Sequence, residues 1–153
     1  MYAEQIRRYL DAYDGKPPRV RLTYVDLTIG ETSGVYFAEG PRGLFPSIYE
    51  FAAEALISIE HHMTGEETAT YPQSAWSELE AFSCDALPWM NFYNQIVRPG
   101  EMLCFPTEQV LGFKPPVNLE RKLYLTPHFS GTEECIATQN IDVYALLYWH
   151  TTG

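Results

Sequence analysis

The chain has 153 residues, the size of one domain, and a globular composition in which 46% of residues are hydrophobic and 20% are charged. Its 20 acidic residues outnumber 10 Lys and Arg, which gives a net charge of −10. This charge excludes direct binding of nucleic acid, which needs Lys and Arg to displace counterions from phosphates, and an anionic membrane surface would repel the chain. We therefore expect the partner to be a basic protein surface.

The cysteine content indicates a reducing compartment. Cys84, Cys104 and Cys135 are odd in number and form no C-x-x-C pair, which argues against a disulfide framework. The N-terminus lacks the apolar core of a secretory signal, and no run approaches the roughly 20 apolar residues that a membrane helix needs. We therefore expect a cytoplasmic protein.

Residues 2–13 are predicted to form a helix that ends before Gly15 and the Pro17-Pro18 pair. Its apolar face consists of Tyr2, Ile6, Tyr9, Leu10 and Tyr13. Five of the ten basic residues fall within the first 21 positions, so the chain is basic at its start and acidic in its middle. Pairing between these two regions within the molecule is the simplest consequence, and a bipolar binding surface is the alternative.

A β-hairpin is predicted next. Residues 20–29 alternate and are rich in β-branched side chains, as in a β-strand, and their apolar parity changes at Tyr24–Val25, which predicts a bulge. Residues 30–34 have the length and glycine content of a hairpin loop, and residues 35–38 form the return strand.

A long helix between Phe45 and Gly65 is the most strongly indicated element. Ser47 and Glu50 form a capping-box pair, in which the Ser hydroxyl accepts the amide of Glu50 and the Glu carboxylate reaches back to the Ser amide. Gly65 is a natural residue to follow a helix. The apolar residues recur at helical spacing, which is typical of a core helix. They are Ile48, Phe51, Ala52, Ala55, Leu56, Ile59 and Met63.

Two shorter helices are predicted after Gly65. One begins at a Ser74 cap and includes Trp76, Leu79 and Phe82, and the other covers residues 89–97. For the second, an irregular segment is the alternative, because Asn91 and Asn94 are poor helix formers. The rest of the chain is β-like, with strands predicted over residues 102–105, 119–125, 135–138 and 141–149. The last of these is apolar on both faces, which indicates a central strand covered on both sides.

The order of these elements predicts one globular α+β domain over residues 1–153. We expect a mainly antiparallel sheet packed with a long central helix and one to three shorter helices.

Catalytic motifs are weak in this chain. It contains no H-E-x-x-H metal motif, no phosphate-binding glycine loop and no G-x-S-x-G, so we expect neither a metal nor a cofactor. A small hydrolase remains the enzymatic alternative. It would use Cys84 or Cys104 with a histidine such as His128, or a carboxylate pair such as Glu50 and Glu54.

The acidic middle of the chain suggests a binding surface. Residues 43–97 contain eight acidic residues and no Lys or Arg, so their carboxylates are expected to lie uncancelled on one side of the molecule. Such a cluster would steer a basic partner, and aromatic side chains in the same region are typical interface anchors. The predicted partner-binding residues are Glu50, Glu54, Glu66, Glu67, Glu78, Glu80, Tyr49, Tyr71 and Trp76.

The pattern favours a non-enzymatic acidic binding module or inhibitor. It would dock on a basic surface of a nuclease or another nucleic-acid-binding enzyme, by analogy with immunity proteins and phage anti-defence inhibitors of this size and charge. Besides the hydrolase, a structural or assembly subunit is an alternative, in which the aromatic surface would form a homo-oligomer.

Overall fold

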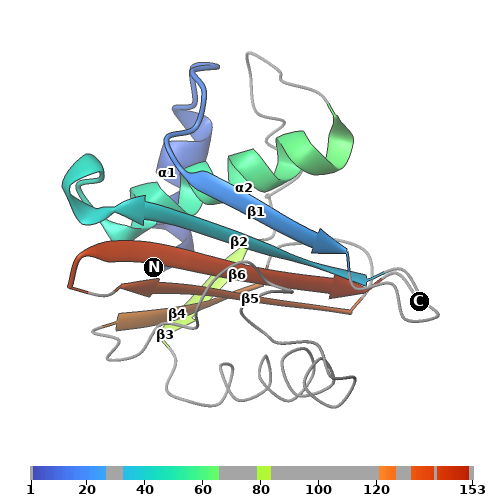
Figure 1. Cartoon of the computed structure of the whole chain (residues 1–153). Helices are drawn as coiled ribbons and strands as arrows, with labels where there is room; N and C mark the ends of the chain where they lie inside the picture. Colours follow the sequence, from blue (N-terminus) through green and yellow to red (C-terminus); the bar gives the residue numbers. More distant parts are fainter. Residues whose placement is uncertain are drawn as a thin grey trace.

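A computed structural model of the chain describes residues 2–26, 33–65, 79–83, 121–126, 132–139 and 141–151. These residues form an antiparallel sheet with helices packed on one of its faces, which confirms the predicted α+β class (Figure 1). The elements in chain order are α1 (Tyr2–Asp11), β1 (Arg21–Asp26), β2 (Ser33–Pro41), the 3-10 helix η1 (Arg42–Leu44), α2 (Ile48–Thr64), β3 (Glu80–Ser83), β4 (Arg121–Thr126), β5 (Thr132–Gln139) and β6 (Val143–Thr151).

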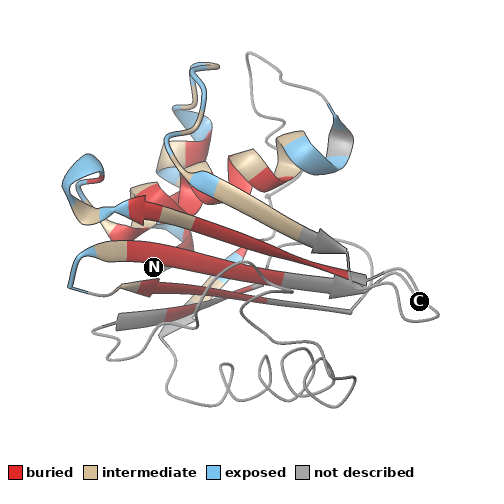
Figure 2. Cartoon of the chain, viewed as in Figure 1, coloured by how far each residue is buried: buried red, intermediate tan, exposed pale blue. Residues whose placement is uncertain are grey.

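The six strands are arranged in the order β1-β2-β6-β5-β4-β3. Strand β6 therefore lies between β2 and β5, with Tyr148 opposite Tyr36 on one side and Cys135 on the other. Leu146 is buried on the helix face of β6 and Leu147 on the opposite face, so the predicted central strand, covered on both sides, is confirmed. Residues 144–148 of this strand are buried in succession (Figure 2). It begins two residues later than predicted, because Ile141 lies in the turn before it and is 70% exposed.

The core lies between the sheet and the helices. Phe51 and Leu56 of α2 are fully buried against β2, β5 and β6, and α1 packs on α2 through Ile6 and Leu10. Burying a Leu, Ile or Phe side chain contributes about 1.5–3 kcal/mol, so these contacts fix the position of both helices on the sheet. Met63, the last member of the predicted apolar stripe, is 41% exposed near the end of α2.

The ends of α2 follow the sequence prediction in part. The hydroxyl of Ser47 accepts a hydrogen bond from the amide of Glu50 at 3.3 Å, and Gly65 adopts a left-handed conformation with a φ of 71°. The predicted return bond from the Glu50 carboxylate to the Ser47 amide is wrong. The carboxylate binds Arg19 instead, because a charged guanidinium is a stronger donor than a neutral backbone amide.

The predicted bulge in β1 is also wrong. Strand β1 pairs residue by residue with β2, from Arg21 opposite Glu39 to Asp26 opposite Gly34. The apolar parity changes because both faces of this sheet are apolar: Tyr24 packs on the helix side, whereas Val35, the partner of Val25, is buried outside the helix-side core.

The segment that includes Phe82 is a strand and not the predicted helix. Residues Glu80–Ser83 form β3 and pair with β4, and the buried Leu79 and half-buried Ala81 alternate with the exposed Glu80. The helix prediction depended on three apolar residues spaced three apart, Trp76, Leu79 and Phe82. A pattern this short does not distinguish a helix from a strand that pairs with a distant part of the chain. The predicted start of this helix at Ser74, the helix over 89–97 and the strand over 102–105 lie outside the described residues.

Candidate functional site

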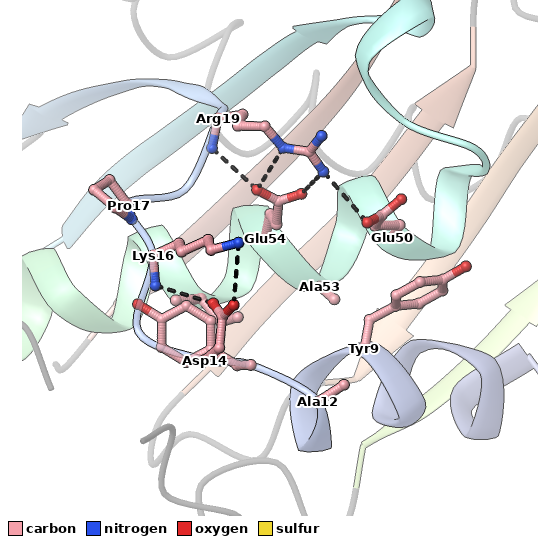
Figure 3. A pocket seen from close by; sticks show the side chains of 11 residues that line it. Tyr9, Ala12, Asp14, Lys16, Pro17, Arg19, Glu50, Ala53 and Glu54 are labelled. Atoms are coloured by element: carbon pink, nitrogen blue, oxygen red, sulfur yellow. Dashed lines mark hydrogen bonds and ion pairs between the residues drawn. The ribbon is translucent and has the colours of Figure 1, made fainter. Parts of the chain in front are cut away.

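A cleft with a volume of about 640 Å³ opens between α1, the segment that follows it, and α2 (Figure 3). Its size is within the range of small-ligand pockets in proteins. Its polar and aromatic walls include Tyr9, Tyr13, Arg19, Glu50 and Glu54. Three carboxylates and two basic side chains line it, so the walls carry a net negative charge.

One stripe of α2 forms the floor of the cleft. Glu50, Ala53, Glu54 and Ile57 recur at spacings of three and four, which places them on the same side of the helix. Ala53 and Ile57 are almost fully buried, so the accessible surface of this stripe comes mainly from the two glutamates. On the opposite wall Tyr9 extends from α1 toward the level of Glu50 (Figure 3).

Arg19 closes one side of the cleft by binding both carboxylates of α2. Its amide and its Nε donate to Oε1 of Glu54 at 3.0 and 3.2 Å, and its Nη2 donates to Oε2 of Glu54 at 2.5 Å. The same Nη2 donates to Oε1 of Glu50 at 3.3 Å. This fork geometry is one that Arg can adopt and Lys cannot.

Arg19 also fixes the chain before β1 to the start of α2. Its Nη1 donates to the carbonyl oxygen of Leu44 at 2.7 Å, and its guanidinium lies 4.7 Å from the ring centroid of Phe45. The hydrogen bonds to Glu54 raise the pKa of Arg19 above its ordinary value, so this group stays charged at any physiological pH. The clamp is therefore a permanent part of the cleft.

The expectation that Glu50 and Glu54 lie uncancelled by the basic start of the chain is wrong. Arg19, from that basic start, binds both, which is the intramolecular pairing that the charge distribution predicted as its simplest consequence. Two glutamates one turn apart repel each other, and a shared arginine relieves that repulsion.

One oxygen of Glu50 is left without a donor. Oε1 binds Arg19, whereas Oε2 is buried and has no hydrogen-bond partner among the described residues. A buried carboxylate oxygen that lacks a donor costs about 1–3 kcal/mol or more, so native proteins rarely leave one without a reason. This unsatisfied acceptor lies beneath the surface of the cleft wall, where solvent does not reach it.

The structure places two other predicted site residues away from this cleft. Glu80 is exposed on β3, an edge strand of the sheet, and Tyr49 is half-buried against the core. The remaining five predictions, Glu66, Glu67, Glu78, Tyr71 and Trp76, lie outside the described residues. Sequence reasoning assigned Tyr9 and Tyr13 to a core-facing helix surface and did not place them in a site. The i, i+4 spacing of these two polar aromatics was the available signal.

A second polar cluster lies where α2 ends over β1 and β2. The hydroxyl of Tyr36 lies 2.9 Å from Nδ1 of His62, and the Tyr24 ring packs 4.5 Å from the Tyr36 ring and 5.0 Å from that of His62. Burial, with a smaller contribution from Tyr24, raises the pKa of Tyr36 to about 12. The phenol therefore keeps its proton at physiological pH, and the cluster attaches the end of α2 to the sheet.

The described residues bring together no constellation that favours catalysis. Cys135 is a fully buried cysteine on the helix face of β5, and a catalytic thiolate needs access to substrate. Cys84, Cys104 and His128 lie outside the described part of the chain. Within that part, no group of three or more His, Cys, Asp and Glu side chains could hold a metal ion, and no helix has the length and apolar character needed to cross a membrane.

Comparison with protein-family models, with curated proteins and with solved structures finds no match for this chain. The chain is therefore described by the physical features of its fold and its site. It is an α+β protein with a negatively lined cleft between two helices, in which an arginine clamp holds a pair of glutamates.

Proposed function

We propose that this protein is a non-catalytic binding protein that docks the α1–α2 side of its surface on a basic region of a protein partner. The observation that supports this proposal best is the cleft between α1 and α2, whose walls hold three carboxylates and two basic side chains. A Lys or Arg side chain of a partner supplies the opposite charge. The net charge of −10 would attract such a partner over a longer range.

The clamp by Arg19 supports binding, because it orients the acceptors in advance. Glu54 is held by three nitrogen atoms of Arg19, and Glu50 is held through its Oε1 alone. A carboxylate that is already ordered loses little conformational entropy when a partner binds. Of the two carboxylates, Glu50 is thus the one that Arg19 holds less tightly.

A nuclease or another nucleic-acid-binding enzyme is the partner class that fits this chemistry. Such enzymes present clustered Lys and Arg, and carboxylates can occupy the positions that phosphates take. The protein would then act as an inhibitor of the immunity-protein or phage anti-defence type, in the cytoplasm, where a cysteine outside any disulfide, such as Cys135, stays reduced.

Site-specific photo-crosslinking in the source cell tests the proposal. A benzophenone amino acid is placed at Tyr9, in the cleft, and in a separate variant at Ile141, which is 70% exposed and outside the cleft. We expect the Tyr9 variant to capture a partner through a peptide rich in Lys and Arg, and the Ile141 variant not to capture that peptide. Equal capture from both positions, or a cleft adduct without basic residues, contradicts the proposal. An adduct between two copies of the chain would instead support the assembly alternative.

A further inference from the structure

We infer that two copies of this chain pair through their β1 strands, with Thr23 of one copy opposite Thr23 of the other, and so join their sheets into one antiparallel sheet. This inference goes beyond the proposed docking function and uses a different part of the molecule. It follows from the backbone groups at the edge of β1, from the way the opposite edge is protected and from the fit of the β1 sequence to itself.

Strand β1 forms one edge of the sheet that the structure describes, because it pairs with β2 on one side and no other described strand lies on its far side (Figure 1). An edge strand presents backbone N–H and C=O groups that can pair with a further strand. Residues 22–24 of β1 are half-buried, whereas residues 35–38 of the adjacent β2 are buried. This partial exposure is the access that pairing at the edge requires.

The β2–β6 ladder shows which groups of β2 face β1. The amide of Arg42 donates to the carbonyl oxygen of Asp142 at 3.0 Å, and these two residues extend the β2–β6 register by one position. Hydrogen-bonded pairs alternate along an antiparallel ladder. The even-numbered residues of β2 therefore direct their backbone groups to β6, and the odd-numbered residues direct theirs to β1.

The same alternation fixes the outward groups of β1. Thr23 lies opposite Phe37, an odd-numbered residue of β2, so the amide and carbonyl of Thr23 face β2. The amides and carbonyls of Leu22 and Tyr24 then point away from the sheet. These are the groups that a second copy would bind.

The two edges of the sheet differ in how they are protected. Natural edge strands avoid pairing with other chains by short length, charged residues, Pro, a bulge or cover from another element. The opposite edge, β3, has four residues, carries the exposed Glu80 and lies against α1, whose Arg7 donates from Nη1 to the carbonyl oxygen of Leu79 at 3.1 Å. Strand β1 has six residues and no Pro, Lys or bulge, and residues 22–25 are uncharged. It is thus the edge that is open to pairing.

The β1 sequence is complementary to itself in one antiparallel register. With Thr23 opposite Thr23, Leu22 lies opposite Tyr24 in both halves, and their outward groups form about four backbone hydrogen bonds. Thr–Thr pairs are favourable cross-strand contacts, and an aliphatic residue opposite an aromatic one buries apolar surface. A shift by two residues sets Leu22 opposite the acidic Asp26, or Tyr24 opposite Val20, which precedes the strand. The register centred on Thr23 is therefore the best match.

The charge of the chain determines how salt acts on this pairing. Each copy carries a net charge of −10, so two copies repel each other over a long range, and the contacts at the edge have to overcome that repulsion. Salt screens the repulsion, so pairing of two copies should strengthen as salt is added. Docking on a basic partner should weaken with salt, so the two kinds of association respond in opposite directions.

Sedimentation of the full-length protein tests the inference. We expect a dimer whose dissociation constant falls at least about threefold between low salt and about 0.5 M salt. Thr23→Lys places two ammonium groups opposite each other and should weaken the dimer at least about tenfold. Glu80→Gln is the control, because it changes the net charge by the same amount at the other edge and should leave the dimer unchanged. A wild-type protein that stays monomeric at about 200 µM in high salt, or a dimer that Thr23→Lys leaves intact, overturns the inference.

Disulfide trapping tests the register, and it stands even where Thr23→Lys fails to fold. Thr23→Cys places two thiols opposite each other in a non-hydrogen-bonded pair, where Cα atoms lie about 4.5 Å apart, within reach of a disulfide. Arg21→Cys is the control, because the Arg21 side chain is 77% exposed but its two copies would lie about 13 Å apart in this register. We expect a covalent dimer from Thr23→Cys alone, with wild-type protein as the reference for the native cysteines. Equal trapping of both variants overturns the pairing.

Hydrogen exchange distinguishes a second copy from another occupant of the edge. The amides of Leu22 and Tyr24 should be protected in the wild-type dimer and exchange faster in Thr23→Lys, whereas the amide of residue 23 faces β2 in both. Protection of Leu22 and Tyr24 in a monomer would show that the edge is covered within the chain, and protection only with a captured partner would assign the edge to that partner. Either result overturns the dimer, and neither bears on the crosslink from Tyr9 that tests docking.

Discussion

Arg19 and Glu54 lie 35 residues apart in the sequence, yet the backbone amide and the guanidinium of Arg19 both bind the same carboxylate. This contact connects the segment before β1 to the second turn of α2. It also brings Nη2 of Arg19 within 3.3 Å of Glu50, so one arginine orders both acidic side chains of the cleft. Arg19 therefore determines both the stability of this contact and the shape of the cleft.

Replacement of Arg19 by alanine should destabilise the fold by about 1–2 kcal/mol. Hydrogen bonds to charged groups contribute about 1.5–3 kcal/mol each, but the Arg19 side chain is 45% exposed and solvent screening reduces that contribution. Arg19→Lys should recover only part of the loss, because an ammonium cannot reproduce the fork. The measurement is the free energy of unfolding from urea titration.

Lys16→Ala is the matched control for the clamp. Lys16 lies in the same segment but pairs with Asp14 in solvent, so its loss should leave the free energy of unfolding unchanged within error. Equal effects of Arg19→Ala and Lys16→Ala would show that the clamp is no more than a surface ion pair.

Gly40→Ala should destabilise the protein by about 1–3 kcal/mol. A Cβ at this position would lie 2.6 Å from the ring of Phe45, which is itself buried between the sheet and α2, so the ring has to move. Gly43→Ala is the control, because a Cβ there meets no atom within 4 Å. Thermal unfolding of both variants measures the effect, and similar melting temperatures would contradict the close packing of Phe45 on β2.

The stability of the fold should fall between pH 10 and pH 12 because of Tyr36. The pKa of this phenol is about 12 in the folded protein and near 10 in the unfolded chain, so the unfolded chain loses the proton first. The contribution of Tyr36 is therefore complete below pH 10 and is lost as the pH rises through this window, by about 2–3 kcal/mol in total.

Tyr36→Phe isolates this contribution from those of the other tyrosines. The variant keeps the ring but has no proton to lose, and it also lacks the hydrogen bond to His62. It should be less stable than the wild type at pH 8, and its free energy of unfolding should decline less steeply from pH 10 to 12. Parallel pH profiles would show that the Tyr36 phenol is not protected by burial.

Replacement of Ser47 by alanine should lower the melting temperature, because it removes the N-terminal cap of α2. The Ser47 hydroxyl accepts the amide of Glu50, and replacement of such a cap by alanine costs about 1 kcal/mol. Ser58→Ala, at a half-buried position inside α2, should be neutral or slightly stabilising, because alanine has the higher helix propensity. The two variants differ only in position, so an equal melting temperature would argue against the cap.

Local patterns in the sequence predicted most of the elements that the structure describes. The stripe and the Ser47 cap predicted α2, alternation predicted β1, and apolar residues on both faces predicted the central position of β6. Each of these signals depends on near neighbours in the chain. The strand β3 was missed because its hydrogen bonds run to β4, about 40 residues away, and no local pattern records that pairing.

The candidate site was predicted less well for the same physical reason. Glu50 and Glu54 were selected for their charge, but the sequence alone placed no basic residue beside them, because Arg19 reaches them only through the fold. The opposite charges of the chain start and the chain middle indicated such pairing in general. They did not indicate that Arg19 would be the partner, or that Oε2 of Glu50 would remain without a donor.

The affinity of the captured partner for wild-type protein and for the Glu50→Gln variant, measured at several salt concentrations, tests the central claim most directly. We predict that the variant binds about tenfold more weakly at low salt and that its affinity depends less on salt, because one desolvated charge pair is lost. Arg19 keeps its bonds to Glu54 in that variant, so the cleft should remain formed. Equal affinity and an equal salt dependence for the two proteins would contradict the account.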